Sequence, residues 1–109
     1  MLKTYSQYAK NFDDYCHGWT KDQKYNFMYL KRIETYCNDL LFKRGYLFLR
    51  DVYEMLGISI TKESCIVGWI YEEHNTIGDN YVKFIYDENE KSNSIRIDFN
   101  VDGDIINRL

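Results

Sequence analysis

Five residues of this chain carry the nitrogen or sulfur atoms with which proteins bind zinc: Cys16, His17, Cys37, Cys65 and His74. Their spacing contains neither the CxxC nor the HxxxH pair that marks most structural zinc sites. The best nucleus for a site is Cys16 with Cys37 across two neighbouring helices, completed by Cys65 or His74. Three of the five fall on predicted apolar faces, where a free cysteine behaves as a small hydrophobic residue. We therefore expect unliganded thiols and no cofactor, with zinc as the alternative.

Catalysis by the adjacent pair Cys16 and His17 is the next possibility. A cysteine nucleophile needs a histidine base within hydrogen-bond reach and a third group that orients this base. Neighbours on a helix diverge by about 100°, so these two side chains do not face each other. The sequence offers no third group, and we predict that the protein is not an enzyme.

Residues 98–104 copy the first half of a calcium-binding loop, with oxygen-bearing side chains at alternate positions and glycine at the sixth. A strand pattern precedes them rather than a helix, and Leu109 stands at the twelfth position, where such loops need glutamate. We therefore interpret the segment as a strand that runs into a turn. In this interpretation Asp98 and Asn100 face solvent, and Asp102 with Gly103 forms the turn.

Acidic residues gather in the C-terminal half and are the main candidates for contacts with a partner. Residues 55–109 carry ten acidic and five basic side chains, a charge of −5 in a chain whose net charge is −3. A polar loop expected at residues 72–80 holds four candidates, and the next turn extends this edge. The candidate partner-binding residues are Glu72, Glu73, His74, Asp79, Asp87, Glu88 and Glu90. Such a surface attracts a partner protein with a basic surface.

Basic and aromatic side chains also mix along the long helix expected in the first half, a combination that contacts RNA or single-stranded DNA. They are Lys21, Lys24, Tyr25, Tyr29, Lys31, Arg32, Tyr36, Lys43, Arg44 and, beyond the helix, Arg50. Interspersed carboxylates such as Glu34 and Asp39 dilute the positive charge. We favour an ordinary charged helix face and keep nucleic-acid binding as an alternative.

Apolar spacing predicts helices in the first half of the chain. Aromatic residues recur with a helical period through about the first sixteen residues, up to a break at Gly18. Residues 20–23 have the form of a capping box, with Thr20 as N-cap of a long helix that ends at Gly45. A short third helix over about residues 49–56 stops at Gly57.

The pattern changes to strands in the second half. Strands are expected at residues 65–71, 81–86 and 95–101, the last with strict alternation of apolar and polar residues. Ile105 and Ile106 predict a final short strand.

These elements predict an α+β fold, with two to three N-terminal helices packed on one face of a small C-terminal antiparallel sheet of three or four strands. We expect a single domain over residues 1–109, with a helical half at about 1–57 and a sheet half at about 58–109. The chain turns polar at once after Met1, and no run reaches the length of a membrane span. The expectation is a cytoplasmic protein without a signal peptide.

A series of short motifs runs in fixed order through residues 25–104. The main ones are residues 44–45, 51–57, 67–71, 78–82 and 98–103. In these motifs the chain resembles a family of small uncharacterised proteins carried by prophages and mobile elements of low-GC Gram-positive bacteria. The resemblance implies no known activity, but it implies a setting in the cytoplasm of a bacterial host. Some small acidic phage proteins of this kind resemble anti-CRISPR proteins, which occupy the basic channels of RNA-guided nucleases.

The expected function is therefore that of a non-enzymatic, phage-encoded inhibitor that binds a host defence nuclease and blocks it by protein–protein contact, as an anti-CRISPR protein does. One alternative is an accessory protein of the phage virion or of its morphogenesis. The other is the small nucleic-acid-binding protein that uses the basic helix face.

Overall fold

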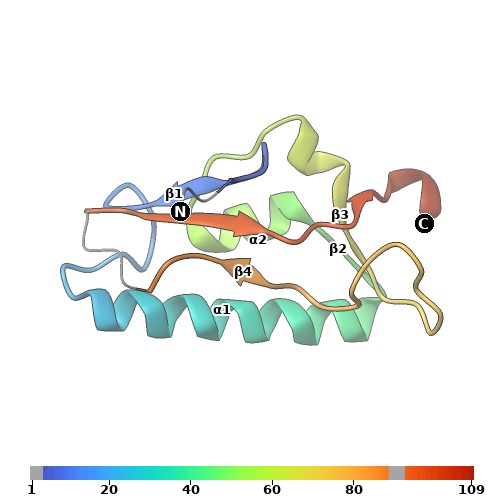
Figure 1. The fold of residues 1–109 in the computed structure, drawn as a ribbon, viewed down its shortest axis with the longest axis horizontal. Helices are drawn as coiled ribbons and strands as arrows, with labels where there is room; N and C mark the ends of the chain where they lie inside the picture. Colours follow the sequence, from blue (N-terminus) through green and yellow to red (C-terminus); the bar gives the residue numbers. More distant parts are fainter. Residues whose placement is uncertain (1–3, 89–92) are drawn as a thin grey trace.

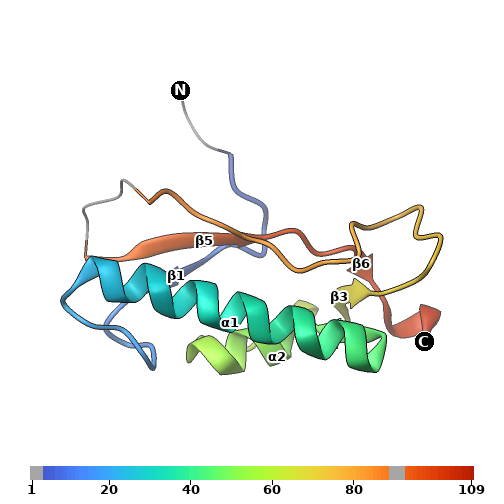
Figure 2. The same cartoon turned by 90° about the horizontal axis from the view of Figure 1, so that it is seen from below.

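The structure of the protein is a computed structural model that describes residues 4–88 and 93–109. Within these residues it is an α+β fold, as expected, with two α-helices and two three-stranded antiparallel sheets. The long helix α1 (Gln23–Arg44) runs along one side of the molecule (Figure 1). Figure 2 shows α1 and the shorter α2 (Leu49–Leu56) on the same side of strand β5 (Ile95–Phe99). The strands are divided between two sheets, where the sequence predicted one.

The long helix begins two residues later than the capping box indicated. Asp22 is the N-cap, and its carboxylate accepts a hydrogen bond from Lys24 N at 3.0 Å. Thr20 binds the buried side chain of Asn26 instead. Thr20 N donates to Asn26 Oδ1 at 2.8 Å, and Asn26 Nδ2 donates to Thr20 O at 3.0 Å. This pairing ties the preceding loop to the first turn of α1.

Both helices end at the predicted glycines. Gly45 has φ 85° and donates its N–H to Leu41 O at 2.8 Å, the usual end of a helix in a left-handed residue. Gly57 ends α2 in the same way, with φ 74°. The two helix ends were predictable because few residues other than glycine adopt this backbone conformation without strain.

The predicted helix over the first sixteen residues is wrong. The described residues from 4 onward form turns and strand β1 (Lys10–Phe12). Asp13 supplies the reason, because its carboxylate accepts from Tyr15 N at 3.1 Å and its carbonyl accepts from Cys16 N at 2.9 Å, a local turn that competes with helix. Tyr15 is 92% exposed, so the helical spacing of the aromatic residues does not mark a buried face.

The first sheet has the strand order β1-β5-β4, and the second has the order β2-β3-β6. The strands not yet defined are β2 (Tyr46–Phe48), β3 (Val67–Ile70), β4 (Phe84–Ile85) and β6 (Gly103–Asp104). β3, β4 and β5 lie within the predicted strands, whereas β1 and β2 were not predicted. Ile106–Arg108 forms a turn of 3-10 helix rather than the predicted last strand, and Gly103 belongs to β6 rather than to a turn.

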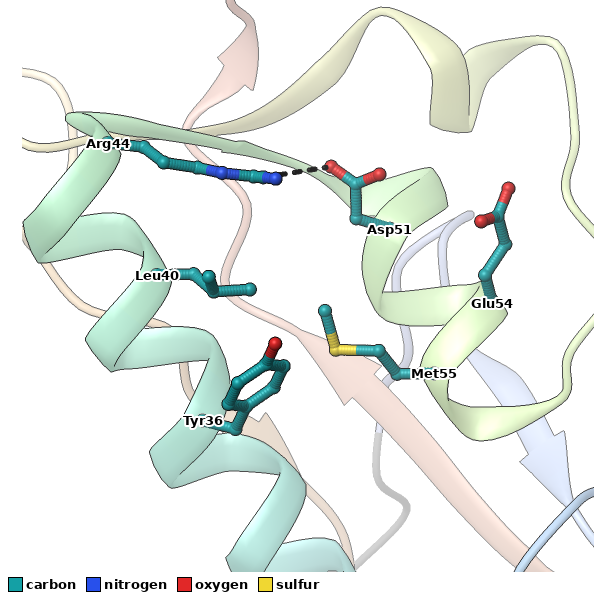
Figure 3. A pocket seen from close by; sticks show the side chains of 6 residues that line it. All are labelled: Tyr36, Leu40, Arg44, Asp51, Glu54 and Met55. Carbon is teal, nitrogen blue, oxygen red and sulfur yellow. Dashed lines mark ion pairs between the residues drawn. The ribbon is translucent and has the colours of Figure 1, made fainter.

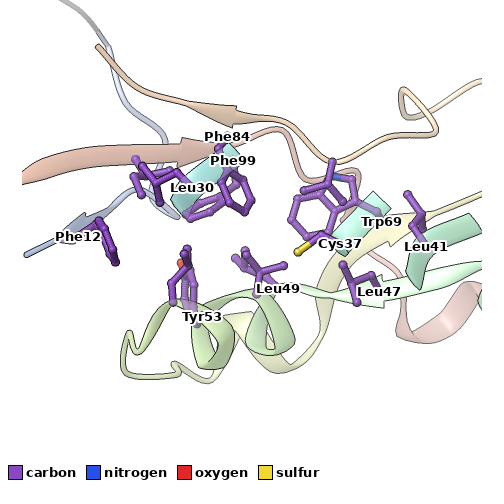
Figure 4. Close-up of a cluster of buried hydrophobic side chains, with 14 of the residues drawn as sticks. Phe12, Leu30, Cys37, Leu41, Leu47, Leu49, Tyr53, Trp69, Phe84 and Phe99 are labelled. Atoms are coloured by element: carbon purple, nitrogen blue, oxygen red, sulfur yellow. The ribbon is translucent and has the colours of Figure 1, made fainter. Parts of the chain in front are cut away.

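The main apolar core lies between the strands and the two helices (Figure 4). The Trp69 ring is completely buried in it, and its Nε1 donates to Asn100 O at 3.1 Å and to Asn100 Oδ1 at 3.0 Å. Asn100 Oδ1 also accepts from Lys83 N at 2.6 Å. Asn100 therefore connects β3 to the segment that leads into β4, and the expectation that it faces solvent is wrong.

Asp98 was also expected to face solvent, but it is only 8% exposed. Its carboxylate accepts hydrogen bonds from Ser6 N at 2.7 Å and from Ser6 Oγ at 2.6 Å. These bonds fasten the N-terminal segment to β5. The oxygens of Asp98 and Asn100 bind donors of the protein itself instead of converging as a calcium site would require.

Replacement of Asp98 with asparagine should destabilise the protein by about 1–3 kcal/mol at pH 7, and by less in acid. Burial alone would raise the pKa of Asp98, but hydrogen bonds from Ser6 and Phe99 and the charge of Arg96 together hold it below its ordinary value of 3.8. A group with a lowered folded-state pKa stabilises the fold above its unfolded-state pKa, and this contribution is lost as the pH falls through the folded-state value.

Urea unfolding at neutral pH and at roughly pH 3 measures this loss. The control is Glu73→Gln, because Glu73 is exposed on the loop after β3. A destabilisation by Asp98→Asn that is equally large at both pH values would contradict the assignment.

Candidate functional site

The acidic loop between β3 and β4 is ordered by two asparagines. Asn80 Oδ1 accepts from Glu72 N at 3.1 Å and from Asn75 Nδ2 at 2.8 Å, while Asn80 Nδ2 donates to Glu72 O at 2.6 Å. Asn75 Oδ1 in turn accepts from Ile77 N and Gly78 N at 2.9 and 2.8 Å. These hydrogen bonds hold the loop in a defined shape.

The predicted acidic residues do not form one surface. Glu72 lies 3.3 Å from the guanidinium of Arg108, and Asp79 accepts a hydrogen bond from Asn100, while Glu73 and His74 are exposed on the loop. Figure 1 shows this loop at one end of the long axis, whereas the chain that follows it runs through β4 toward the other end. Asp87 and Glu88, which follow β4, are exposed. Glu90 lies outside the described residues. The structure thus places the two parts of the predicted edge far apart.

The zinc candidates do not come together. Cys37 is buried, and its Sγ contacts Met55 Sδ at 3.7 Å, whereas Cys65 Sγ contacts Thr61 O at 3.4 Å. Burial, with the neighbouring Glu34 and Asp51 charges, raises the pKa of Cys37 to about 12. Residues 4–88 and 93–109 contain no group of three or more His, Cys, Asp or Glu that is placed to hold a metal ion.

The pair Cys16 and His17 is no better placed for catalysis. Burial is the largest of the causes that raise the pKa of the Cys16 thiol, and the charges of Asp13 and Asp14 also raise it. A raised pKa disfavours the thiolate, which is the nucleophilic form. His17 packs against Gly57 at the end of α2.

The structure instead gathers exposed tyrosine, methionine and arginine on one side of α1, and we call this surface the tyrosine face. It consists of Tyr25, Met28, Arg32 and Tyr36, which follow one another at intervals of three or four residues and so share one side of the helix. Tyr25 is 61% exposed, Met28 50% and Tyr36 53%. These residue types are enriched at protein–protein interfaces, so the tyrosine face is our candidate functional site.

One end of the tyrosine face opens into a pocket between the two helices, with a volume of about 350 Å³. Figure 3 shows Tyr36, Leu40 and Arg44 of α1 opposite residues of α2. The α2 wall is formed by Asp51, Glu54 and Met55. Arg44 and Asp51 close one side, with 3.9 Å between their nearest nitrogen and oxygen atoms. We call this the inter-helix pocket.

The other end opens into a second pocket of about 250 Å³, which we call the loop pocket. It is lined by Gly18, Thr20, Tyr25, Met28, Tyr29 and Arg32. Gly18 has φ 82° and lies so close to the Tyr29 ring that a Cβ at this position would overlap it. Tyr29 Oη donates to Met55 O at 3.2 Å, which joins α1 to α2 between the two pockets.

The opposite side of α1 is occupied by β4. Asn38 behaves there like a neighbouring strand, because its Oδ1 accepts from Val82 N at 2.7 Å and its Nδ2 donates to Val82 O at 3.0 Å. Glu34 Oε2 accepts from Phe84 N at 2.7 Å. These side chains already bind backbone groups along the segment that forms β4. These backbone groups are therefore not available to pair with an added strand of a partner.

Tyr25, Arg32 and Tyr36 were predicted as members of a basic helix face. Met28 and Met55 were not predicted as candidates. The available signal was the spacing of positions 25, 28, 32 and 36, which is a helical stripe in its own right. The spacing does not predict where α2 packs. The inter-helix pocket forms because α2 lies opposite one end of this stripe.

Comparison with known proteins adds a family but no activity. No match was found among curated proteins or among solved structures. Neither helix in the described part of the chain is long and apolar enough to cross a membrane. A family model described as a family of unknown function matches residues 1–109, and the chain therefore belongs to that family, DUF6353.

Proposed function

We propose that the protein is a non-enzymatic binding protein that acts by occupying a surface of a partner protein with its tyrosine face. The observation that carries this proposal is that three large side chains, each at least half exposed, surround Arg32 on one side of α1. Single exposed apolar residues are ordinary on protein surfaces. A row of them with a pocket at each end is typical of a surface that a partner covers.

The residue types suit such a role. Tyrosine brings a large contact area, a hydroxyl group and few rotatable bonds, so that little conformational entropy is lost on binding. Methionine adapts its shape to the partner, and Arg32 provides donors for a carboxylate. The two pockets offer places for anchoring side chains of the partner, which usually contribute most of the binding energy.

The proposed partner is a host defence nuclease of the RNA-guided type, in the cytoplasm of a bacterial host. The motif resemblance to prophage proteins supports this partner, and the acidic C-terminal half suits a basic nuclease surface. The net negative charge of residues 55–109 would attract such a partner over a distance, and this attraction weakens as the salt concentration rises. A structural protein of a phage particle is the alternative partner.

The carboxylates that lie beside several of the basic residues favour a protein partner over nucleic acid. Lys31 lies 3.9 Å from Glu34, and both Arg44 and Arg50 lie within 4.0 Å of Asp51. Three of the seven cations in the predicted basic face thus have a carboxylate beside them. Nucleic-acid affinity comes mainly from cations that are free to neutralise phosphates.

Affinity purification of tagged protein from its host tests the proposal, with mass spectrometry to identify and quantify the partner. The double variant Tyr25→Ala/Tyr36→Ala should recover at least about tenfold less partner, as expected when aromatic contact residues are lost. The matched control is Tyr71→Ala/Tyr81→Ala, which removes two other exposed tyrosines, 40% and 47% exposed, outside the tyrosine face.

Equal recovery by both double variants would contradict the proposal. The identity of the recovered protein then distinguishes a nuclease from a component of a phage particle. Recovery that disappears on nuclease treatment of the lysate would indicate nucleic acid instead.

A further inference from the structure

We propose that the partner segment bound by the tyrosine face is an amphipathic α-helix with an apolar residue in each pocket and an acidic residue between them, at Arg32. This inference rests on the proposed function, which says only that the face binds a protein. It adds the secondary structure, the spacing and the charge of the segment that is bound.

The spacing of the two apolar residues in the partner helix is inferred from the positions of the two pockets along α1. The α1 residues of the loop pocket are centred near Tyr29, and those of the inter-helix pocket are centred near Leu40. Eleven residues of helix correspond to about 16 Å along the axis, or about three turns. A second helix lying along α1 presents residues that are eleven apart on one side, so that one helical segment reaches both pockets.

The choice of a helix follows from the walls of the groove. The loop pocket and the inter-helix pocket are lined mainly by side chains of α1 and α2, whose main-chain groups are already bonded within the helices. An extended segment would find few main-chain partners there and would have to leave its own N–H and C=O groups to solvent. A helix satisfies these groups internally and offers only side chains to the groove, as in other helix-in-groove complexes.

The charge of the bound segment follows from the arrangement of charges along the groove. Arg32 is the α1 residue of the loop pocket that is nearest to the inter-helix pocket along the helix, one turn from Met28 and one from Tyr36, and it is exposed. Among residues 4–88 and 93–109, no carboxylate lies within 4 Å of its guanidinium. Asp51 and Glu54, in contrast, give the far wall of the inter-helix pocket a negative charge. A carboxylate of the partner is therefore attracted near Arg32 and repelled near Asp51 and Glu54.

Fluorescence anisotropy with a designed peptide tests this inference on the full-length protein. The probe is a labelled, alanine-rich helical peptide with two leucines about eleven residues apart and a single glutamate one turn inside one of them. It is made with the glutamate beside the first leucine and, separately, beside the second, so that in either direction of binding one of the two peptides brings its glutamate to Arg32 and away from Asp51 and Glu54. The control peptides have lysine at the glutamate position. We expect the tighter-binding glutamate peptide to bind at least about tenfold more tightly than its lysine counterpart.

A charge reversal on the protein completes the test. Arg32→Glu should abolish or reverse the preference for glutamate, and Tyr81→Ala should leave it unchanged. Circular dichroism checks that both variants keep the wild-type fold. Equal affinity for each glutamate peptide and its lysine counterpart, or no binding of any of the peptides, overturns the inference. If the affinity purification still shows a partner that depends on Tyr25 and Tyr36, the proposed function survives this failure.

Discussion

Replacement of Trp69 with alanine should lower the free energy of unfolding by about 3–5 kcal/mol, the range for loss of a large buried side chain. Trp69 is completely buried in the main core between the sheets and the helices (Figure 4). The substitution leaves a cavity and also removes the N–H that binds both Asn100 O and Asn100 Oδ1. Because a small domain has a total stability of about 5–15 kcal/mol, much of its stability would be lost.

The measurement is urea unfolding followed by circular dichroism, with Trp69→Phe as the comparison. Phenylalanine keeps an apolar ring but has no N–H, so this variant should lose less stability than Trp69→Ala does. An alanine variant that shows no cooperative unfolding transition would also agree with the prediction, because it would already have lost its stable fold. A loss below about 1 kcal/mol would contradict the packing described here.

The second large effect is expected at Gly68, where alanine should destabilise the protein by about 3 kcal/mol or more. Gly68 lies opposite Phe48 in the antiparallel pairing of β3 with β2. A Cβ at this position would overlap the carbonyl oxygen of Leu47. Since the obstacle is the backbone of the neighbouring strand, it can move only if the pairing of the two strands is disturbed.

Gly45→Ala provides the comparison, because a Cβ at Gly45 meets no atom within 4 Å. It should cost only the roughly 1–2 kcal/mol of placing alanine in a left-handed conformation. Urea unfolding of the two variants separates the effects. If Gly68→Ala is no more destabilising than Gly45→Ala, the close approach of β2 and β3 is not as described.

The sequence predicted those parts of the fold that depend on local signals. Gly45 and Gly57 end their helices because of their own backbone freedom, and the alternation of residues 95–99 marks β5 without reference to its neighbours. β1 and β2 escaped prediction because each has three residues and is defined by its partner. Lys10 pairs with Ile97, and Tyr46 with Ile70, at separations that no local pattern records.

The same distinction explains the candidate site. The helical spacing of the tyrosines of α1 is visible in the sequence, but this spacing does not say which side of the helix is buried. The helix in fact buries Asn26, Leu30, Cys37 and Leu41, which leaves Tyr25 and Tyr36 exposed. Which side of a long helix is covered depends on where β4 and α2 pack, and this is a property of the whole fold.

The acidic candidates failed to form one surface for a related reason. Sequence proximity suggested that Glu72 and Asp87 border the same edge of the sheet. The chain crosses the molecule in between, through β4, so that their segments lie toward opposite ends of the long axis (Figure 1). The polar composition of the loop correctly predicted that Glu73 and His74 are exposed. It did not predict toward which end of the molecule the loop lies.

Site-specific photo-crosslinking in the host tests most directly whether the protein acts by occupying a partner through the tyrosine face. A photoreactive phenylalanine analogue replaces Tyr36 in one variant and Tyr81 in another, both of them exposed positions. We predict that the partner is crosslinked from position 36 and not from position 81. Crosslinking of the partner from position 81 alone would contradict this account.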